Sequence, residues 1–87
     1  MFPAGDVFSA YLTGTGTAVA YRTRVRGFFI NGTGTAIFRD GGASGPTLLT
    51  LNSTGAHTGV IPANGILFKT DVHVTISGLT ALTVFHG

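Results

Sequence analysis

The sequence predicts an all-β domain, a compact antiparallel β-sandwich or barrel of the jelly-roll type with about seven to eight short strands. Glycine is frequent, with 14 residues, and Thr, Val, Ile and Phe are common, whereas the helix formers Lys, Glu and Gln are nearly missing. Short apolar runs recur between Gly, Asn, Asp and Pro clusters at intervals of about 8 to 12 residues, which is typical of sandwiches and barrels. No window shows the 3.6-residue periodicity of an amphipathic helix.

Eight segments have the composition of strands, because each is an apolar or alternating run bounded by turn-forming residues. They are residues 7–13, 17–22, 24–30, 35–39, 47–51, 65–69, 72–77 and 81–85, with the alternative that the second and third form one long strand bent near Thr23. Val72, Val74 and Ile76 alternate with polar residues, so one face of that strand should pack against a core.

The expected strands are separated by strong turn signals. Asn31-Gly32 is the best short hairpin signal, because both residues tolerate the positive φ of a type I′ turn. A longer turn is expected over residues 40–46, where Asp40 precedes two glycines and suits an Asx-type turn. Further breaks are expected at the polar loop 52–59, at the turn 61–65, and at Gly78, which should open the last hairpin.

The whole chain, residues 1–87, is expected to form one domain with a thin core, since a domain this small buries only about 60 to 65% of its unfolded surface. Hydrophobic residues make up 44% and charged residues only 9%, against roughly a quarter charged in ordinary domains. So few charges predict a surface partly covered by partners. Because there are no cysteines, oligomerisation is the remaining means of stabilising the small core.

No apolar run approaches the roughly 20 residues of a membrane helix, and the start MFPAGDVF lacks the pattern of a signal peptide. We therefore expect no membrane partner and no export.

The pentapeptide GTGTA occurs twice, from Gly14 and from Gly32. A dinucleotide fingerprint needs a third glycine three residues after the second, where this chain has Val19 and Ile37. Neither copy is followed by the Lys-Ser or Lys-Thr of a phosphate-binding loop. We therefore expect both copies to form turns that lead into strands.

Alternating arginines form a candidate interface. Arg22, Arg24 and Arg26 should project from one face of a strand as a basic stripe. Since the net charge is only +2, this stripe favours pairing with acidic residues of another protein over binding nucleic acid. Phe28 and Phe29 complete the candidate interface, because adjacent rings put apolar groups on both faces of a strand.

Catalytic, metal and cofactor sites are not expected. If a two-residue loop at 79–80 closed the last hairpin, His73 and His86 would become cross-strand neighbours, but two imidazoles make a poor metal site without a third ligand. No serine lies in a nucleophile elbow, and Asp6, Asp40 and Asp71 are the only acidic residues. The sequence predicts a protein that is not an enzyme and has no cofactor.

From Arg22 onward the chain resembles a set of small virion structural proteins encoded by short-tailed marine phages, including phages of cyanobacteria. The motifs that carry the resemblance are RTRVRG at 22–27, RDGGASGP at 39–46 with Leu48-Leu49, IPANGILF at 61–68 with Asp71-Val72, and LTVFHG at 82–87. The resemblance implies a non-enzymatic component of a phage particle, with no metal and no catalytic residues.

We expect from this resemblance a capsid decoration or cement protein in the virion, assembled in the host cytoplasm. Its partners would be further copies of itself, as a homo-oligomer for which a trimer is the expected state, and the major capsid protein. The alternative is a tail or fibre-associated host-recognition module in which loops 40–46 and 52–59 contact a glycan. A third class, a nucleic-acid-binding β protein, would show affinity that falls steeply with salt.

Overall fold

The computed structural model describes residues 8–61 and 65–87, which form seven strands in one antiparallel sheet. The strands are β1 (Phe8–Leu12), β2 (Gly16–Val19), β3 (Thr23–Arg39), β4 (Thr47–Thr54), β5 (His57–Val60), β6 (Ile66–Phe68) and β7 (Val72–His86). The predicted all-β class is confirmed. The strands pair as one open sheet, so the expected division into a jelly-roll-like sandwich, or closure into a barrel, is not confirmed. No helix in the described part has the length and hydropathy needed to cross a membrane.

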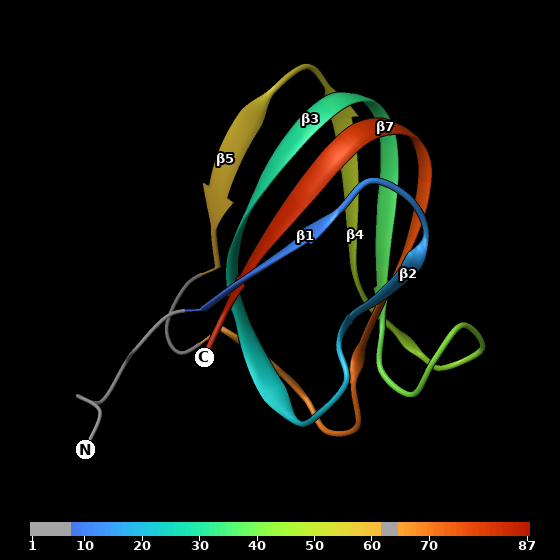
Figure 1. Cartoon of the computed structure of the whole chain (residues 1–87), viewed down its shortest axis with the longest axis vertical. Helices are drawn as coiled ribbons and strands as arrows, with labels where there is room; N and C mark the ends of the chain where they lie inside the picture. Colours follow the sequence, from blue (N-terminus) through green and yellow to red (C-terminus); the bar gives the residue numbers. More distant parts are fainter. Residues whose placement is uncertain (1–7, 62–64) are drawn as a thin grey trace.

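Two long strands, β3 and β7, form the scaffold of the sheet. They pair with each other from Val25 opposite His86 to Arg39 opposite His73, and Figure 1 shows them arching together over the top of the molecule. Every other strand pairs with one of these two: β1 and β2 with β7, and β4, β5 and β6 with β3. The bent ribbon of β3 and β7 therefore decides where all the shorter strands lie.

Glycines make the bend in this ribbon. Gly32 and Gly78 have φ values of 101° and 83°, in the left-handed region that favours glycine. A Cβ at Gly32 would lie 2.7 Å from the backbone nitrogen of Thr80, and one at Gly78 would lie 2.8 Å from the carbonyl oxygen of Thr33. The pairing register shifts on both sides of Gly32, as it does at β-bulges.

The predicted hairpin turns at Asn31-Gly32 and at Gly78 are therefore wrong. These glycines have positive φ because they form bulges inside strands that continue past them. Segments 24–30 and 35–39 therefore belong to one strand, β3, and segments 72–77 and 81–85 belong to another, β7. The prediction that both GTGTA copies form turns is correct for the first copy and wrong for the second. The copy at Gly14 bends the chain and leads into β2, as predicted, whereas the copy at Gly32 lies inside β3.

The shorter strands agree with most of the predicted segments. Residues 8–12, 47–51 and 66–68 match predicted strands, while Val7 and residues 62–64 lie outside the described part. Strand β4 continues through residues 52–54, where a loop was expected. The first three residues of β5 also lie in the segment 52–59 that was expected to be loop. This strand was not predicted because its four residues contain only one large apolar side chain. Strands β2 and β3 are separate, so the alternative of one strand bent near Thr23 is wrong.

One hydrophobic core is shared by both halves of the bent ribbon. Its buried members come from β2, β3, β6, β7 and the bend, and they are Val19, Val25, Ile30, Ala36, Phe38, Phe68, Val72, Val74, Leu79, Leu82 and Val84. The ring of Phe68 in β6, which pairs with the first residues of β3, lies 6.4 Å from the ring of Phe38 near the other end of β3. The sheet therefore curls until its two halves pack on each other, and the predicted packing of Val72 and Val74 is confirmed.

The predicted turn over residues 40–46 is present, closed by a 3.1 Å hydrogen bond from the N–H of Asp40 to the carbonyl of Pro46. The carboxylate of Asp40 does not form the expected local Asx turn. It accepts hydrogen bonds from the N–H groups of Lys69 and Thr70, at 3.0 and 2.9 Å, in the turn between β6 and β7. The carboxylate can reach this turn because both turns lie at the same end of the ribbon, where Arg39 pairs with His73.

Candidate functional site

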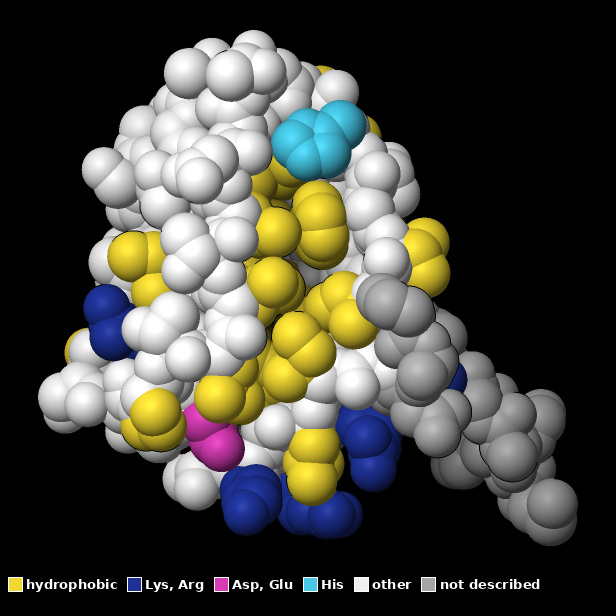
Figure 2. Space-filling view, turned by 180° about the vertical axis from the view of Figure 1, so that it is seen from behind, with side chains coloured by type: hydrophobic (Ala, Val, Ile, Leu, Met, Phe, Trp, Pro, Cys, Tyr) yellow, Lys and Arg dark blue, Asp and Glu magenta, His cyan; other side chains and the backbone are white. Residues whose placement is uncertain are grey.

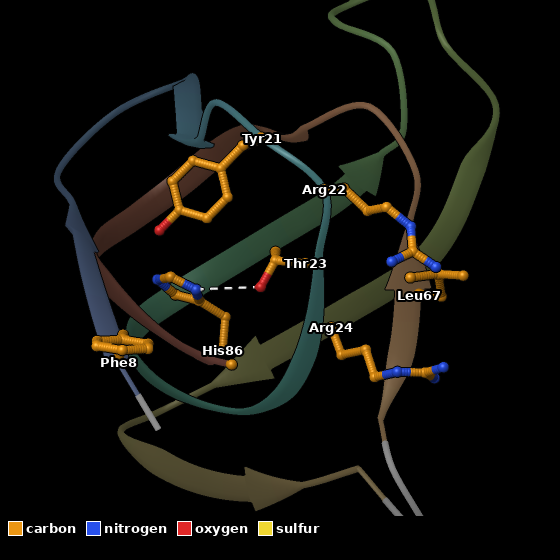
Figure 3. A pocket seen from close by; sticks show the side chains of 8 residues that line it. Phe8, Tyr21, Arg22, Thr23, Arg24, Leu67 and His86 are labelled. Carbon is orange, nitrogen blue, oxygen red and sulfur yellow. Dashed lines mark hydrogen bonds between the residues drawn. The ribbon is translucent and has the colours of Figure 1, made fainter. Parts of the chain in front are cut away.

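A pocket of about 250 Å³ opens where three strands of the sheet have their ends together (Figure 3). Strands β1 and β3 both pair with the last residues of β7, so Phe8, at the start of β1, lies opposite His86, as does Val25 near the start of β3. The residues that line the pocket are Phe8, Tyr21, Arg22, Thr23, Arg24, Leu67, His86 and Gly87. The pairing of strand ends creates this site from segments far apart in the sequence.

The imidazole of His86 is the most buried polar group of the pocket, with 5% of the residue exposed. Its Nδ1 lies 3.3 Å from the hydroxyl of Thr23, and its ring lies 5.9 Å from the ring of Phe8 and 6.3 Å, edge to face, from that of Tyr21. Burial lowers the pKa of His86, because removal from water disfavours the charged form. A neutral imidazole can both donate and accept a hydrogen bond.

The rim of the pocket combines aromatic and cationic side chains. Phe8 is 53% exposed and Tyr21 is 59% exposed, so both rings present apolar surface to solvent. Figure 3 shows these rings beside His86, on one side of the segment that contains Thr23, while Arg22 and Arg24 extend on the other side toward Leu67. The pocket therefore offers aromatic surface and two guanidinium groups on either side of a hydroxyl and an imidazole.

Two of the three arginines of the predicted stripe line the pocket. Arg22 is exposed in the bend before β3, Arg24 is partly buried within β3, and both line the pocket. Arg26 falls where the register between β3 and β7 shifts, and it is not among the lining residues. Its Nε is buried and has no hydrogen-bond partner among the described residues. Like Arg24, Arg26 alternates with buried residues of β3, so the predicted alternation of the arginines is present.

The two candidate phenylalanines lie on different faces of β3, as predicted. Phe28 packs against the core, its ring covers Gly59 of β5, and it meets the imidazole of His57 edge to face at 5.9 Å. Phe29 is exposed on the opposite face. Only Phe29 of this pair presents its ring as free surface.

Apolar side chains also gather in a shallow hollow on the rear of the molecule. Figure 2 shows this hollow with a histidine at its upper end and charged side chains at its lower end. Partly buried apolar residues that border the core in and beside the edge strands are Phe28, Leu49, Leu51, Ile61 and Ile66. The chain buries the core itself and leaves part of its apolar border exposed.

The conditional pairing of His73 with His86 is wrong, because β7 continues through Gly78 without a turn. His73 lies opposite Arg39, and His86 lies opposite Val25 at the other end of the strand. Among residues 8–61 and 65–87, no group of three His, Cys, Asp or Glu side chains could hold a metal ion.

Sequence patterns did not indicate Phe8, Tyr21 or Thr23 as site residues, and they considered His86 only as a metal ligand together with His73. Their positions next to one another depend on the long-range pairing of β1, β3 and β7, and the local signal was that Tyr21 and Thr23 adjoin Arg22. Comparisons with protein-family models, with curated proteins and with solved structures found no match to this chain.

Proposed function

We propose that the protein is a non-enzymatic structural subunit of a phage virion, a decoration or cement protein that binds the assembled capsid and stabilises it. The observation that carries the proposal is the amount of large apolar surface on a chain with few charges. The exposed large hydrophobic residues are Phe8, Tyr11, Tyr21, Phe29, Leu48 and Val60, and Val60 is 83% exposed. Apolar surface of this extent is typical of a protein that works against neighbours.

The open sheet supplies a way of making such contacts. Strands β1 and β4 are the outermost strands of the sheet path, and β5 and β6 lie on the same side of β3 as β4. Edge strands have backbone groups that a strand of another subunit can pair with. This geometry supports a homo-oligomer, for which we keep a trimer as the expected state, held by edge pairing and by apolar side chains such as Val60.

The arginines would supply the polar part of the contact. Arg22, Arg24 and Arg26 are proposed to pair with acidic residues of the major capsid protein or of a sister subunit.

A protein that binds only the assembled shell stabilises that state by mass action, by about 2.7 kcal/mol per site when its free concentration is 100 times the Kd.

The test is the stability of capsids with and without the protein. Capsids lacking it should lose resistance to heat or pressure, and addition of the wild-type chain should restore it. Val60→Lys should restore less, because it places a charge in the apolar contact, whereas Ser44→Lys adds the same charge in an exposed turn and is the matched control. Equal resistance of capsids with and without the protein would refute the cementing role.

A tail or fibre-associated host-recognition role is the second candidate, and the pocket with its exposed aromatic rings favours it. The number of copies per particle distinguishes the cement role from the recognition role. Immunogold labelling or imaging of intact particles should show hundreds of copies over the head for a cement protein. A few to a few tens of copies on the tail would support the recognition role.

A further inference from the structure

We propose that the outer face of strands β5, β3, β7 and β1 is the surface that contacts the capsid, and that it meets a shell surface with an apolar centre and acidic side chains beside it. The inference rests on the proposed capsid role and adds which face of the subunit is turned toward the shell. We call this surface the aromatic face, and its large side chains are Tyr11, Phe29, Val60 and Phe85.

Two neighbouring cross-strand rows form the aromatic face, over the four strands that lie side by side in Figure 1. One row runs from Val60 through Gly27 and Phe85 to Ser9, and the next runs from Thr58 through Phe29 and Thr83 to Tyr11. Residues directly opposite each other in a sheet share a face, and successive residues of a strand alternate between faces. Because Phe28 and Val84 pack in the core, both rows point outward.

The large side chains of the two rows are neighbours on this face. A Cβ at Gly27 would lie 3.6 Å from Cδ2 of Phe85 and 3.7 Å from the Cα of Val60. The ring of Phe85 therefore lies beside Gly27, where no side chain separates it from Val60. In the next row Phe29 is 39% exposed and Tyr11 is 67% exposed. The two rows thus present apolar surface to solvent across four strands.

The same scaffold has a polar outer face in the other half of the bent ribbon. The corresponding rows there run from Asn52 through Thr35 to Ser77, and from Thr50 through Ile37 to Thr75. Ile37 is the one large apolar side chain of these six residues, as is usual for a sheet face in water. Strands β3 and β7 form the middle of both faces, so the rings of the aromatic face are not required by the sheet itself. Contiguous apolar surface of this kind marks a protein contact, and aromatic residues and Arg are enriched in such contacts.

Arg22 and Arg24 lie beside the aromatic face and add a preference for an acidic partner. Arg24 is opposite Leu67 in β6, and Figure 3 shows both arginines extending toward Leu67. Guanidinium groups bind carboxylates through paired hydrogen bonds. Within residues 8–61 and 65–87 the acidic side chains are Asp40 and Asp71, and both carboxylates accept hydrogen bonds from turn backbone of their own chain. A second copy offers the same two engaged carboxylates, so we assign the acidic side chains to the capsid protein.

The centre and the margin of the aromatic face suit different neighbours. Phe29 and Phe85 belong to β3 and β7, which have partner strands on both sides at these positions, so no further strand can pair there. Val60 belongs to the edge strand β5, where pairing with a sister subunit remains available. Contact with the shell through the centre of the face is therefore compatible with a homo-oligomer held by its edges.

Single thiols can report which face is covered, because the chain has no cysteine. Thr58→Cys places a thiol opposite Phe29 on the aromatic face, and Thr50→Cys places one opposite Ile37 in the other half; both threonines are exposed. Each variant is bound to purified capsids that lack the protein and is then treated with a maleimide. Labelling of Thr58→Cys should be slower than in the free chain by about ten-fold or more, and that of Thr50→Cys should change by less than about two-fold, because the centre of an interface excludes water.

Substitutions test the same contact through the affinity for these capsids. Phe29→Thr removes the ring, keeps a residue type that favours strands, and should weaken binding by about ten-fold or more. Ile37→Thr, which removes a large apolar side chain from the outer face of the same strand in the other half, is the matched control and should bind like wild type. Arg24→Gln should weaken binding and reduce its dependence on salt, with Lys69→Gln as its control. Circular dichroism checks that each variant is folded.

The possible results separate the aromatic face from the capsid role. Wild-type chain that does not bind the capsids would refute both. If the wild type binds while the thiol of Thr58→Cys stays fully reactive, or while Phe29→Thr binds equally well, the capsid role stands and the aromatic face is wrong. Labelling of Thr58→Cys that slows with rising protein concentration in the absence of capsids, with no such change in Thr50→Cys, would show that a second copy covers the face.

Discussion

The carboxylates of Asp40 and Asp71 each accept hydrogen bonds from backbone N–H groups in the turn that contains the other residue. Asp40 accepts from Lys69 and Thr70, and Asp71 accepts from Gly41 and Gly42, both at 3.0 Å. This exchange joins the β3–β4 turn to the β6–β7 turn. Two of the three acidic residues of the chain are used in it.

Removing either carboxylate should destabilise the fold, and the two effects should be coupled. Asp71→Ala leaves the N–H groups of Gly41 and Gly42 without their acceptor, which should cost about 1 to 2 kcal/mol for partly exposed charge-assisted bonds. Asp40→Ala should also lower the Tm, and the double variant should lose less than the sum, because both bonds hold the same pair of turns. Chemical denaturation measures all three variants, with Ser44→Ala in the same loop as control. Strictly additive losses would contradict the coupling.

Acid should destabilise the protein through Asp40. The hydrogen bonds from the backbone of Lys69 and Thr70 lower the pKa of Asp40 from its ordinary value of 3.8, because they favour the charged carboxylate. The stabilisation is therefore present above pH 3.8 and is lost as the pH falls through the lower pKa of the folded state. Thermal denaturation from about pH 5 to about pH 2 should show this loss. In Asp40→Asn the Tm should fall less steeply over this acid range. An unchanged decrease in Tm would refute the attribution of the acid sensitivity to Asp40.

His86 should produce a second pH dependence nearer neutrality. Burial lowers the pKa of His86 below its ordinary value of 6.5, so the unfolded chain takes up the proton first as the pH falls. The stability due to the neutral imidazole is then complete above the ordinary pKa of 6.5. It declines as the pH falls from there toward the pKa of the folded state. The Tm should decrease between about pH 7.5 and pH 5.5, and His86→Gln should reduce the slope. His57→Gln, at an exposed imidazole, is the control, and a slope retained in His86→Gln would argue against this origin.

The two GTGTA copies should respond differently to alanine. A Cβ at Gly34 would collide with the carbonyl oxygen of Ser77 across the bend, and Gly78→Ala would strain a backbone with φ of 83°. Each of these two substitutions should lower the free energy of unfolding by about 1 to 3 kcal/mol. Gly14→Ala meets no atom within 4 Å and should change stability by no more than about 0.5 kcal/mol. Urea denaturation of the three variants makes the comparison, and equal losses at Gly14 and Gly34 would show that the bend does not depend on close approach.

Local patterns predicted the class of the fold and most strand positions. The alternation at Val72 and Val74, the adjacent rings of Phe28 and Phe29, and the turn over residues 40–46 depend on neighbours in the sequence, and each is found as predicted. Such features are decided within a few residues, by side-chain period and by turn chemistry.

Features decided by partner strands could not be predicted in this way. Asn31-Gly32 has the chemistry of a hairpin turn, but β3 continues through it in its pairing with β7, where it forms a bulge. The pocket depends on the same kind of information, since Phe8 and His86 lie at opposite ends of the chain and meet through pairing of β1 with β7. Asp40 likewise has its partners about 30 residues away in the sequence.

The dependence of every short strand on the β3–β7 ribbon imposes an order of events during synthesis and folding. Strands β1 and β2 are made first but pair with β7, which follows all the other described strands in the chain. They therefore have no strand to pair with until β7 has been synthesised, and β3 and β7 must close a long loop before their first contacts form. Sheets with such non-local pairing fold on the scale of about milliseconds to seconds. We expect the sheet to form only after β7 has been synthesised, as one late and cooperative step.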